Sequence, residues 1–495
     1  MRLAGGPARS GDMVVAGAAV SVLIGWAVGT SHGLLAAMVL VMACAFAVGI
    51  CEWRRAVYGL LAYLPFSGVP ILASYPRTTI AVLLKDFLFV LPAYLGFAVW
   101  AVANRQRILF NRALAVLLGL LSALVLAQAL NPSLPSRLVG LVGAKVWLFY
   151  LPLWVLGYHL VRKRRDLDRL LAVMSIAAVV PVLLGLTEAV LIYSGHPAQV
   201  YRWYGVAASA ATQDFAELAF EGGGALRRVP STFSFVSQYY AFVMAMLAVT
   251  YAWWKGVLAG TRWSVAGAGL WALVLLAGLA SGARGALLSI PLVVVLLLVL
   301  ERRGGRLPFG RLATLVLVLV TTIALVGLDP RRLSTGLARL GLGNFHDVFL
   351  KGFREALRLT VGGLGTGIDT NAGRYVAAGS GRLNAVQGVW YESWFVKAVL
   401  ELGVAGLLLV TLIVGTLALG TLRERRLVTG HRLRAIWASL AVVLLWNIVY
   451  SLKGQYIDMD PTNVYFWLFA GVLARVPALA RQAPVEREEA SGARS

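Results

Sequence analysis

The chain has 495 residues, of which 59% are hydrophobic, with a mean hydropathy of +0.79 and a formal net charge of +23. Apolar runs of roughly 18 to 25 residues recur along its length, each long enough to cross a bilayer as a helix, which excludes a soluble globule. Most positive charges stand at the ends of these runs, where membrane topology explains them, and no nucleic-acid recognition module is present. The sequence therefore predicts an integral membrane protein with no nucleic-acid partner.

The first apolar segment, 13–30, follows a short basic start and is followed at once by another span. Because no small-residue cleavage site stands out after it, we interpret it as a retained helix rather than a signal peptide. Cys44 and Cys51 lie in or beside one span, so they predict neither a disulfide framework nor a metal site.

Hydropathy along the whole chain predicts an all-α polytopic membrane protein with about fourteen transmembrane helices. The expected spans are 13–30, 33–50, 57–73, 79–102, 113–130, 144–161, 170–193, 232–254, 264–281, 285–301, 311–328, 393–420, 434–452 and 462–476. The loops between them alternate between a basic set and a set whose short loops carry one Arg or Lys each. The basic set is expected in the cytoplasm, which puts both termini there.

Two long loops, 194–231 and 329–390, then fall on the outer side and divide the chain. We expect eleven helices over 1–328, a large outer loop over 329–390, three helices over 391–476 and a disordered tail over 477–495. In the large loop, apolar residues at helical spacing predict an amphipathic helix over 344–360. The Gly cluster that starts at Gly362 ends this helix, and an irregular Gly- and Ala-rich flap follows.

Ionisable groups at the outer lip of the bilayer are the informative ones, because charge is costly there and is usually paired or functional. Arg284 lies in the tight turn "SGARGALLS", where small neighbours allow a ligand close to the backbone and a guanidinium can bind a phosphate through two hydrogen bonds. The alternative is an Arg that extends toward lipid headgroups. Arg228 precedes Pro230 and Ser231, which are expected to begin a helix. The positive N-terminus of that helix and the Arg228 side chain would then together attract an anion. The alternative is that Arg228 is a loop charge without a function.

Charged residues also lie within predicted spans. Lys85 and Asp86 lie inside the outer end of the fourth span, and adjacent residues on a helix point about 100° apart, so they need not pair with each other. Each is expected to have either a buried partner elsewhere or a ligand. Lys397 and Glu401 are four residues apart in one span and are expected to neutralise one another.

Further candidates lie in and beside the large loop. Arg354 and Arg358 share a face of the amphipathic helix and Arg374 follows the Gly cluster, so they form either a solvated lid or a guide for an anionic ligand. Glu392 stands among aromatic residues, including Tyr391, where the chain returns to the membrane; a semi-buried carboxylate there could act as a general base. His346 is a weaker candidate, and this face carries no metal cluster and no Gly-rich nucleotide loop.

Three segments resemble the O-antigen polymerase/ligase superfamily of bacterial membrane glycosyltransferases. "SGARGALLS" (281–289) is similar to its Ser-x-Ser-Arg-Gly element, with Ala283 replacing the second Ser. "RVPSTFSFVSQYYAF" (228–242) resembles its Arg-x-x-Gly-Thr-Phe stretch. "GGLGTGIDT" followed by "ESWFVKAVLELGVAG" resembles the pattern that closes the large periplasmic loop. Counting back from "ELGVAG", the His and Asn positions of the ligases hold Glu392 and Ser393, which favours a repeat-unit polymerase over a ligase.

The resemblance implies transfer from an undecaprenyl-diphosphate-linked glycan donor to a glycan acceptor at the periplasmic face of the inner membrane, without metal, cofactor or nucleotide sugar. It implies Arg228 and Arg284 as ligands of the diphosphate and Glu392 as the base or acceptor-orienting group. Arg354, Arg358 and Arg374 would guide the anionic donor. A chain-length regulator and a flippase are candidate protein partners.

Two other functions remain open at this point. A ligase would pass finished glycan to lipid A core or to a protein. A transporter or flippase for an anionic lipid would be expected to show paired repeats and interrupted helices at mid-membrane, and the sequence shows neither.

Overall fold

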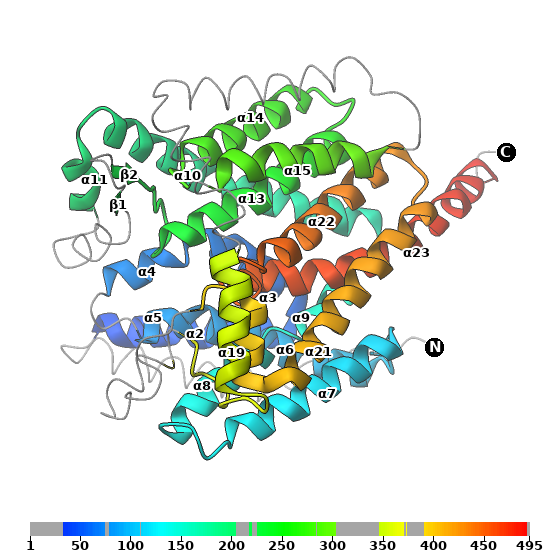
Figure 1. The fold of residues 1–495 in the computed structure, drawn as a ribbon. Coiled ribbons are helices and arrows are strands. Elements are labelled where there is room, and N and C mark those ends of the chain that lie inside the picture. Colours follow the sequence, from blue (N-terminus) through cyan, green and yellow to red (C-terminus); the bar gives the residue numbers. More distant parts are fainter. Residues whose placement is uncertain are drawn as a thin grey trace. The chain divides into compact units, whose positions relative to one another are not determined.

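The computed structural model describes residues 33–74, 79–108, 110–203, 217–219, 225–283, 285–302, 346–370, 373 and 391–492. The predicted helical fold is confirmed within these ranges, which are almost entirely helical (Figure 1). A short antiparallel hairpin of β1 (Glu217–Ala219) and β2 (Ala225–Arg227) is the exception in the described segments. The expected spans 13–30 and 311–328 lie outside the described residues.

Seven helical segments in the described ranges are long and apolar enough to cross a membrane. They are Ile80–Ala103, Arg112–Ala129, Arg137–Leu160, Arg164–Tyr193, Trp394–Leu427, His431–Tyr450 and Thr462–Arg481. Each overlaps a span expected from hydropathy, so these helices fit a helical membrane protein. The full set of fourteen spans and their orientation stay predictions.

Four further helices overlap expected spans, and one expected span is broken in the structure. The four helices are α2 (Gly33–Cys51), α13 (Val236–Ala252), α14 (Ser264–Ala280) and α15 (Ala286–Glu301). The expected span 57–73 is divided into α3 (Trp53–Tyr63), a 3-10 turn η1 (Leu64–Phe66) and α4 (Gly68–Ala73). Pro65 stands at the start of η1, and a proline interrupts a helix because it has no backbone N–H to donate.

The chain forms two compact units, one of residues 1–61 and 79–106 and the other of 62–78 and 107–495. The first contains α2, α5 (Thr79–Lys85), the π-helical turn η2 (Asp86–Val90) and α6 (Leu91–Ala103). Lys85 is buried there with its Nζ 3.8 Å from Asp86 Oδ1. Lys85 therefore lies near the carboxylate of its neighbour, a pairing that the helical spacing did not predict.

The second unit holds the remaining helices used below. They are α7 (Arg112–Ala129), α8 (Arg137–Leu148), α9 (Leu153–Leu160), α10 (Arg164–Tyr193), α19 (Gly352–Leu359), α21 (Trp394–Glu424), α22 (His431–Tyr450) and α23 (Thr462–Gly492). α9 packs closely on α23, and α13 packs on α14 and α22 (Figure 1). At the α9–α23 contact, a Cβ on Gly157 would lie 2.1 Å from Leu468 O. Only glycine permits this approach of two backbones.

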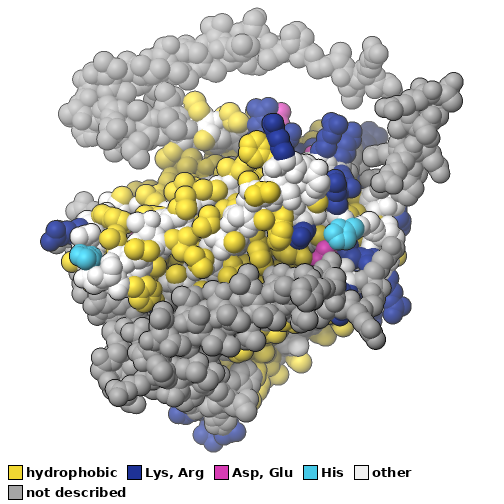
Figure 2. Space-filling view, turned by 90° about the horizontal axis from the view of Figure 1, so that it is seen from above, with side chains coloured by type: hydrophobic (Ala, Val, Ile, Leu, Met, Phe, Trp, Pro, Cys, Tyr) yellow, Lys and Arg dark blue, Asp and Glu magenta, His cyan; other side chains and the backbone are white. Residues whose placement is uncertain are grey.

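Basic side chains bind helix ends at one end of this unit. Arg432 donates to Ala259 O at 2.7 Å, and Arg425 donates to Val299 O at 2.9 Å and Arg302 O at 2.7 Å. Figure 2 shows a broad apolar surface with Lys and Arg side chains at its margins. Cations beside the C-terminal carbonyls of helices are stabilising. These contacts bring together loops from the set expected in the cytoplasm, and we call this the basic end.

Candidate functional site

Two of the resembling segments meet away from the basic end, beside the last residue of α22. The backbone N–H of Val229 donates to Ser281 O at 3.1 Å, which joins the segment after Arg228 to the turn that carries Arg284. Arg284 itself lies outside the described residues, but its neighbour Gly285 packs on Tyr450: a Cβ there would lie 2.5 Å from Tyr450 Oη. The turn, the Arg228 segment and the end of α22 are therefore in direct contact.

The charges of two predicted catalytic residues also meet at Tyr450. Arg228, which is half-buried, and Glu392, which is exposed, both interact electrostatically with the Tyr450 hydroxyl. Arg228 acts on the Tyr456 hydroxyl as well. The Tyr450 hydroxyl thus lies within electrostatic range of one cation and one carboxylate, which could serve as separate anion-binding and proton-accepting groups.

The segment after Arg228 differs from the helix start expected from the sequence, because α13 begins at Val236 and not at Pro230 or Ser231. Ser231 has a left-handed backbone with φ of 51°. Its N–H donates to Glu188 Oε2 at 2.8 Å and its hydroxyl donates to Pro181 O at 2.7 Å. These contacts with α10 hold the segment in a turn, so the helix starts five residues after Ser231 and its N-terminus is not beside Arg228 in sequence.

Glu392 is held in place through the backbone of its neighbours. Trp394, which begins α21, donates its N–H to Ser451 O at 3.1 Å. On the other side, Gln455 Nε2 donates to Tyr391 O at 2.9 Å. Both partners belong to the loop between α22 and α23, which directly follows Tyr450. The position of Glu392 relative to Tyr450 is thus fixed by this loop.

A buried charge network lies beneath Glu392. Lys397 Nζ donates to Asp458 Oδ2 at 2.6 Å. Glu401 instead accepts hydrogen bonds from Trp147 Nε1 at 2.7 Å and from the N–H of Asp369 at 2.9 Å. Lys397, Glu401 and Asp369 are each at most 1% exposed. Lys397 also lies within electrostatic range of Glu401, so the expected attraction exists, but the direct partner of Lys397 is Asp458.

The Gly-rich stretch "GGLGTGIDT" fits against a break in α21. Gly403 has a non-helical backbone with φ of 74°, which frees carbonyls in the preceding turn. Leu364 N–H donates to Leu400 O at 2.8 Å, and Gly365 N–H donates to Glu401 O at 3.2 Å. From α7, Gln128 Nε2 donates to Gly362 O at 2.6 Å. The stretch therefore satisfies the backbone groups that the helix break exposes.

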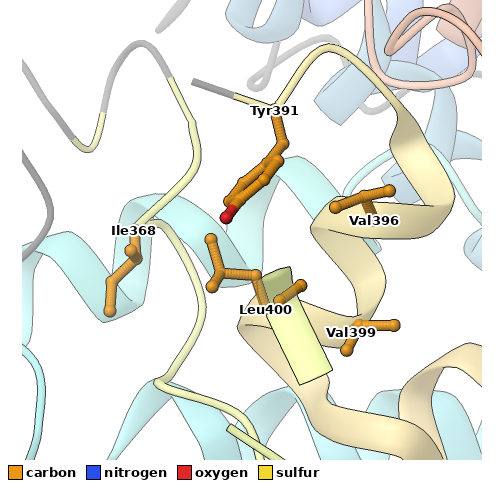
Figure 3. Packing of buried hydrophobic residues seen from close by; sticks show 6 residues of the cluster. Ile368, Tyr391, Val396, Val399 and Leu400 are labelled. Atoms are coloured by element: carbon orange, nitrogen blue, oxygen red, sulfur yellow. The ribbon is translucent and has the colours of Figure 1, made fainter. Parts of the chain in front are cut away.

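The expected amphipathic helix is present in its described part as a π-helical turn η4 (His346–Lys351) followed by α19. Its apolar side chains pack on the start of α21, along which α19 lies (Figure 1). Tyr391 is buried beneath it, and its ring points toward Ile368 and Leu400 (Figure 3). Burial, aided by the negative charge of Glu355 and then of Asp369, raises the pKa of Tyr391 to about 12. This packing gives Tyr391 a structural role, whereas its predicted ligand role stays untested.

The remaining predicted site residues are Arg354, Arg358, His346, Arg374 and Lys85. Arg354 and Arg358 are exposed on α19. The side chain of His346 and the whole of Arg374 lie outside the described residues. Lys85 belongs to the other compact unit and pairs with Asp86.

Sequence reasoning missed several residues that build the site: Glu188, Tyr240, Tyr450, Gln455, Tyr456 and Asp458. The available signal was the short loop "SLKGQYIDMDP", which carries more polar groups than a plain connection between two spans needs. Within the described part of the chain, no group of three or more His, Cys, Asp or Glu side chains is arranged to hold a metal ion.

Comparisons with known proteins add no relative: no family model, no curated protein and no solved structure matches the chain. The class that the fold defines is a helical membrane protein. The resemblance to the O-antigen polymerase/ligase superfamily rests on the three short segments named above.

Proposed function

We propose that this protein is a glycosyltransferase that joins undecaprenyl-diphosphate-linked oligosaccharide repeat units, in O-antigen or exopolysaccharide assembly, at the periplasmic face of a bacterial inner membrane. The observation that carries the proposal is the contact between the Arg228 segment and the Arg284 turn at Tyr450, whose hydroxyl also lies within electrostatic range of Glu392. Segments that are far apart in the chain and that resemble one superfamily in order also lie together in space.

The proposed reaction is a displacement at the anomeric carbon of the donor sugar. The oxygen of an acceptor hydroxyl bonds to this carbon while the bond from the carbon to the diphosphate oxygen breaks, and undecaprenyl diphosphate leaves. The acceptor proton passes to the Glu392 carboxylate, which is exposed and so accessible. Arg228 and Arg284 would stabilise the charge that develops on the diphosphate.

The test is a glycan analysis of cells in which the native gene is replaced by Arg228→Ala or Glu392→Gln. Loss of a positioned base or of a charge-stabilising group slows such reactions by about a hundredfold or more. Polymer should therefore be lost, and single lipid-linked repeat units should remain. The matched controls are Arg262→Ala and Glu52→Gln, which change exposed residues outside the site and should leave polymer yield and length unchanged.

Each other result has a defined meaning. Accumulation of long lipid-linked polymer in the two variants would identify a ligase. Unchanged polymer length and yield in both variants, with the protein present at normal levels, would refute the assignment of these residues and leave an anionic-lipid transporter as the alternative.

A further inference from the structure

Three tyrosines from separate parts of the chain form a cluster at the site: Tyr240 in α13, Tyr450 at the end of α22, and Tyr456 in the following loop. The ring centroids of Tyr450 and Tyr456 are 4.4 Å apart with planes at 88°, and those of Tyr240 and Tyr450 are 5.9 Å apart. We call these residues the tyrosine cluster. The edge-to-face packing of Tyr450 on Tyr456 is a preferred aromatic geometry that fixes the direction of each hydroxyl.

The hydroxyls of the tyrosine cluster lie against the backbone of the Arg284 turn. Tyr240 Oη hydrogen-bonds Ser289 Oγ, which donates to the carbonyl of Gly285. A Cβ on Gly285 would meet Tyr450 Oη at 2.5 Å and Tyr240 Oη at 3.3 Å. Since any larger residue would displace these hydroxyls, the turn and the tyrosine cluster form one packed unit.

The charges that act on Tyr450 distinguish it within the cluster. Tyr240 is 3% exposed, whereas Tyr450 and Tyr456 are half-buried. The charge of Arg228 acts on both half-buried hydroxyls, and that of Glu392 acts on Tyr450. Tyr450 is thus a half-buried residue whose hydroxyl touches the Arg284 turn and lies within electrostatic range of both other predicted catalytic residues.

A phenol beside an arginine suits one class of ligand. A tyrosine hydroxyl has an ordinary pKa of about 10, so it is protonated at neutral pH and can donate. Neutral O–H donors add hydrogen bonds to an anion without adding charge, and such bonds to an ionised acceptor are short and strong. A diphosphate has more acceptor oxygens than one guanidinium can satisfy.

We propose that the tyrosine cluster is a subsite for a diphosphate ester, in which the Tyr450 hydroxyl donates a hydrogen bond to an anionic oxygen held by Arg228. Tyr240 and Tyr456 orient that hydroxyl. This inference rests on the proposed function for the identity of the ligand, a polyprenyl diphosphate. It assigns Tyr450 to the leaving group and not to the acceptor sugar.

The experiment measures binding of undecaprenyl diphosphate without a sugar to the purified full-length protein in detergent. Tyr450→Phe keeps the ring and removes the hydroxyl, and loss of a hydrogen bond to a charged oxygen should weaken binding by about tenfold or more. Tyr456→Phe should weaken binding less, since it acts through Tyr450. Tyr465→Phe is the matched control, because its buried hydroxyl has no hydrogen-bond partner among the described residues, and it should bind as the wild type does.

Melting temperatures of all variants check that folding is retained. Equal affinity of folded Tyr450→Phe and wild type for undecaprenyl diphosphate would overturn the inference, as would a loss seen only with the sugar-bearing lipid. If the wild type binds undecaprenyl diphosphate, Tyr450→Phe weakens it and no glycan is elongated, the subsite stands and the proposed function fails. If elongation occurs and Tyr450→Phe binds normally, the function stands and the subsite fails.

Discussion

At the residue scale, the buried ion pair between Lys397 and Asp458 ties the start of α21 to the loop that follows Tyr450. The spacing of four residues suggested Glu401 as the partner of Lys397, whereas its direct partner is Asp458. Asp458 lies 61 residues from Lys397, and spacing within one helix carries no information on such a contact. Removing one member of a buried pair leaves an uncompensated charge, which costs far more than removing both.

We therefore expect Lys397→Met and Asp458→Asn to lower the stability of the folded protein by about 3 kcal/mol each. The double variant should lose clearly less than the sum of the two, because neither charge is then left alone. Denaturation of the purified protein in detergent measures this coupling. Additive losses would show that the two side chains do not depend on each other.

Tyr391 gives a dependence of stability on pH. Its pKa in the folded protein is about 12, above the ordinary value of 10.0 for tyrosine. Between these values the folded state holds a proton that the unfolded state has lost, so the contribution of Tyr391 to stability is full below about pH 10 and declines toward about pH 12. The difference in melting temperature between wild type and Tyr391→Phe should shift against the wild type over this range. A difference that does not change with pH would contradict the packing described beneath α19.

At the element scale, the break in α21 and the Gly-rich stretch depend on each other, because the stretch donates hydrogen bonds to carbonyls that the break exposes. The sequence indicated that the Gly cluster follows an amphipathic helix, and α19 ends at Leu359 as expected. Gly403 was included in an unbroken span, because a single glycine in an apolar run has no distinctive pattern. The break becomes evident only from its partners, which donate hydrogen bonds across the fold.

Two adjacent glycines test this pairing. Gly363 has φ of 93°, and a Cβ there would lie 2.8 Å from both Glu401 O and Gly403 N. A Cβ on Gly362 would meet nothing within 4 Å. Gly363→Ala should destabilise the protein by about 1 to 3 kcal/mol through backbone strain and this clash. Gly362→Ala should be nearly neutral in the same denaturation measurement, and equal effects of the two substitutions would contradict the docking of the stretch.

At the scale of the whole molecule, hydropathy and charge alternation were sufficient to predict a helical membrane protein and most of its described helices. They did not predict which loops meet, since periodicity describes one helix at a time. The contacts in the larger unit separate a basic end from the end that carries Tyr450. The turn after Arg228 could not be predicted for the same reason. The buried Glu188 that holds Ser231 in this turn belongs to another helix.

The predicted topology places these two ends on opposite sides of the membrane. In a variant with Cys44 and Cys51 replaced by Ser, a single Cys at exposed Leu359 should react with a membrane-impermeant maleimide in intact cells. A single Cys at exposed Arg262, near the basic end, should react only after permeabilisation. Reaction of both positions in intact cells, or the opposite pattern, would contradict the orientation.

The most direct test of the central claim is the reaction itself. Purified wild-type protein is incubated with an undecaprenyl-diphosphate-linked repeat unit, and the lipid-linked products are separated by length. The account predicts a ladder of products that differ by one repeat unit, one undecaprenyl diphosphate released for each bond formed, and no ladder with Glu392→Gln. An unchanged single repeat unit after incubation with folded protein that binds the lipid would contradict it, as would an undiminished ladder from Glu392→Gln.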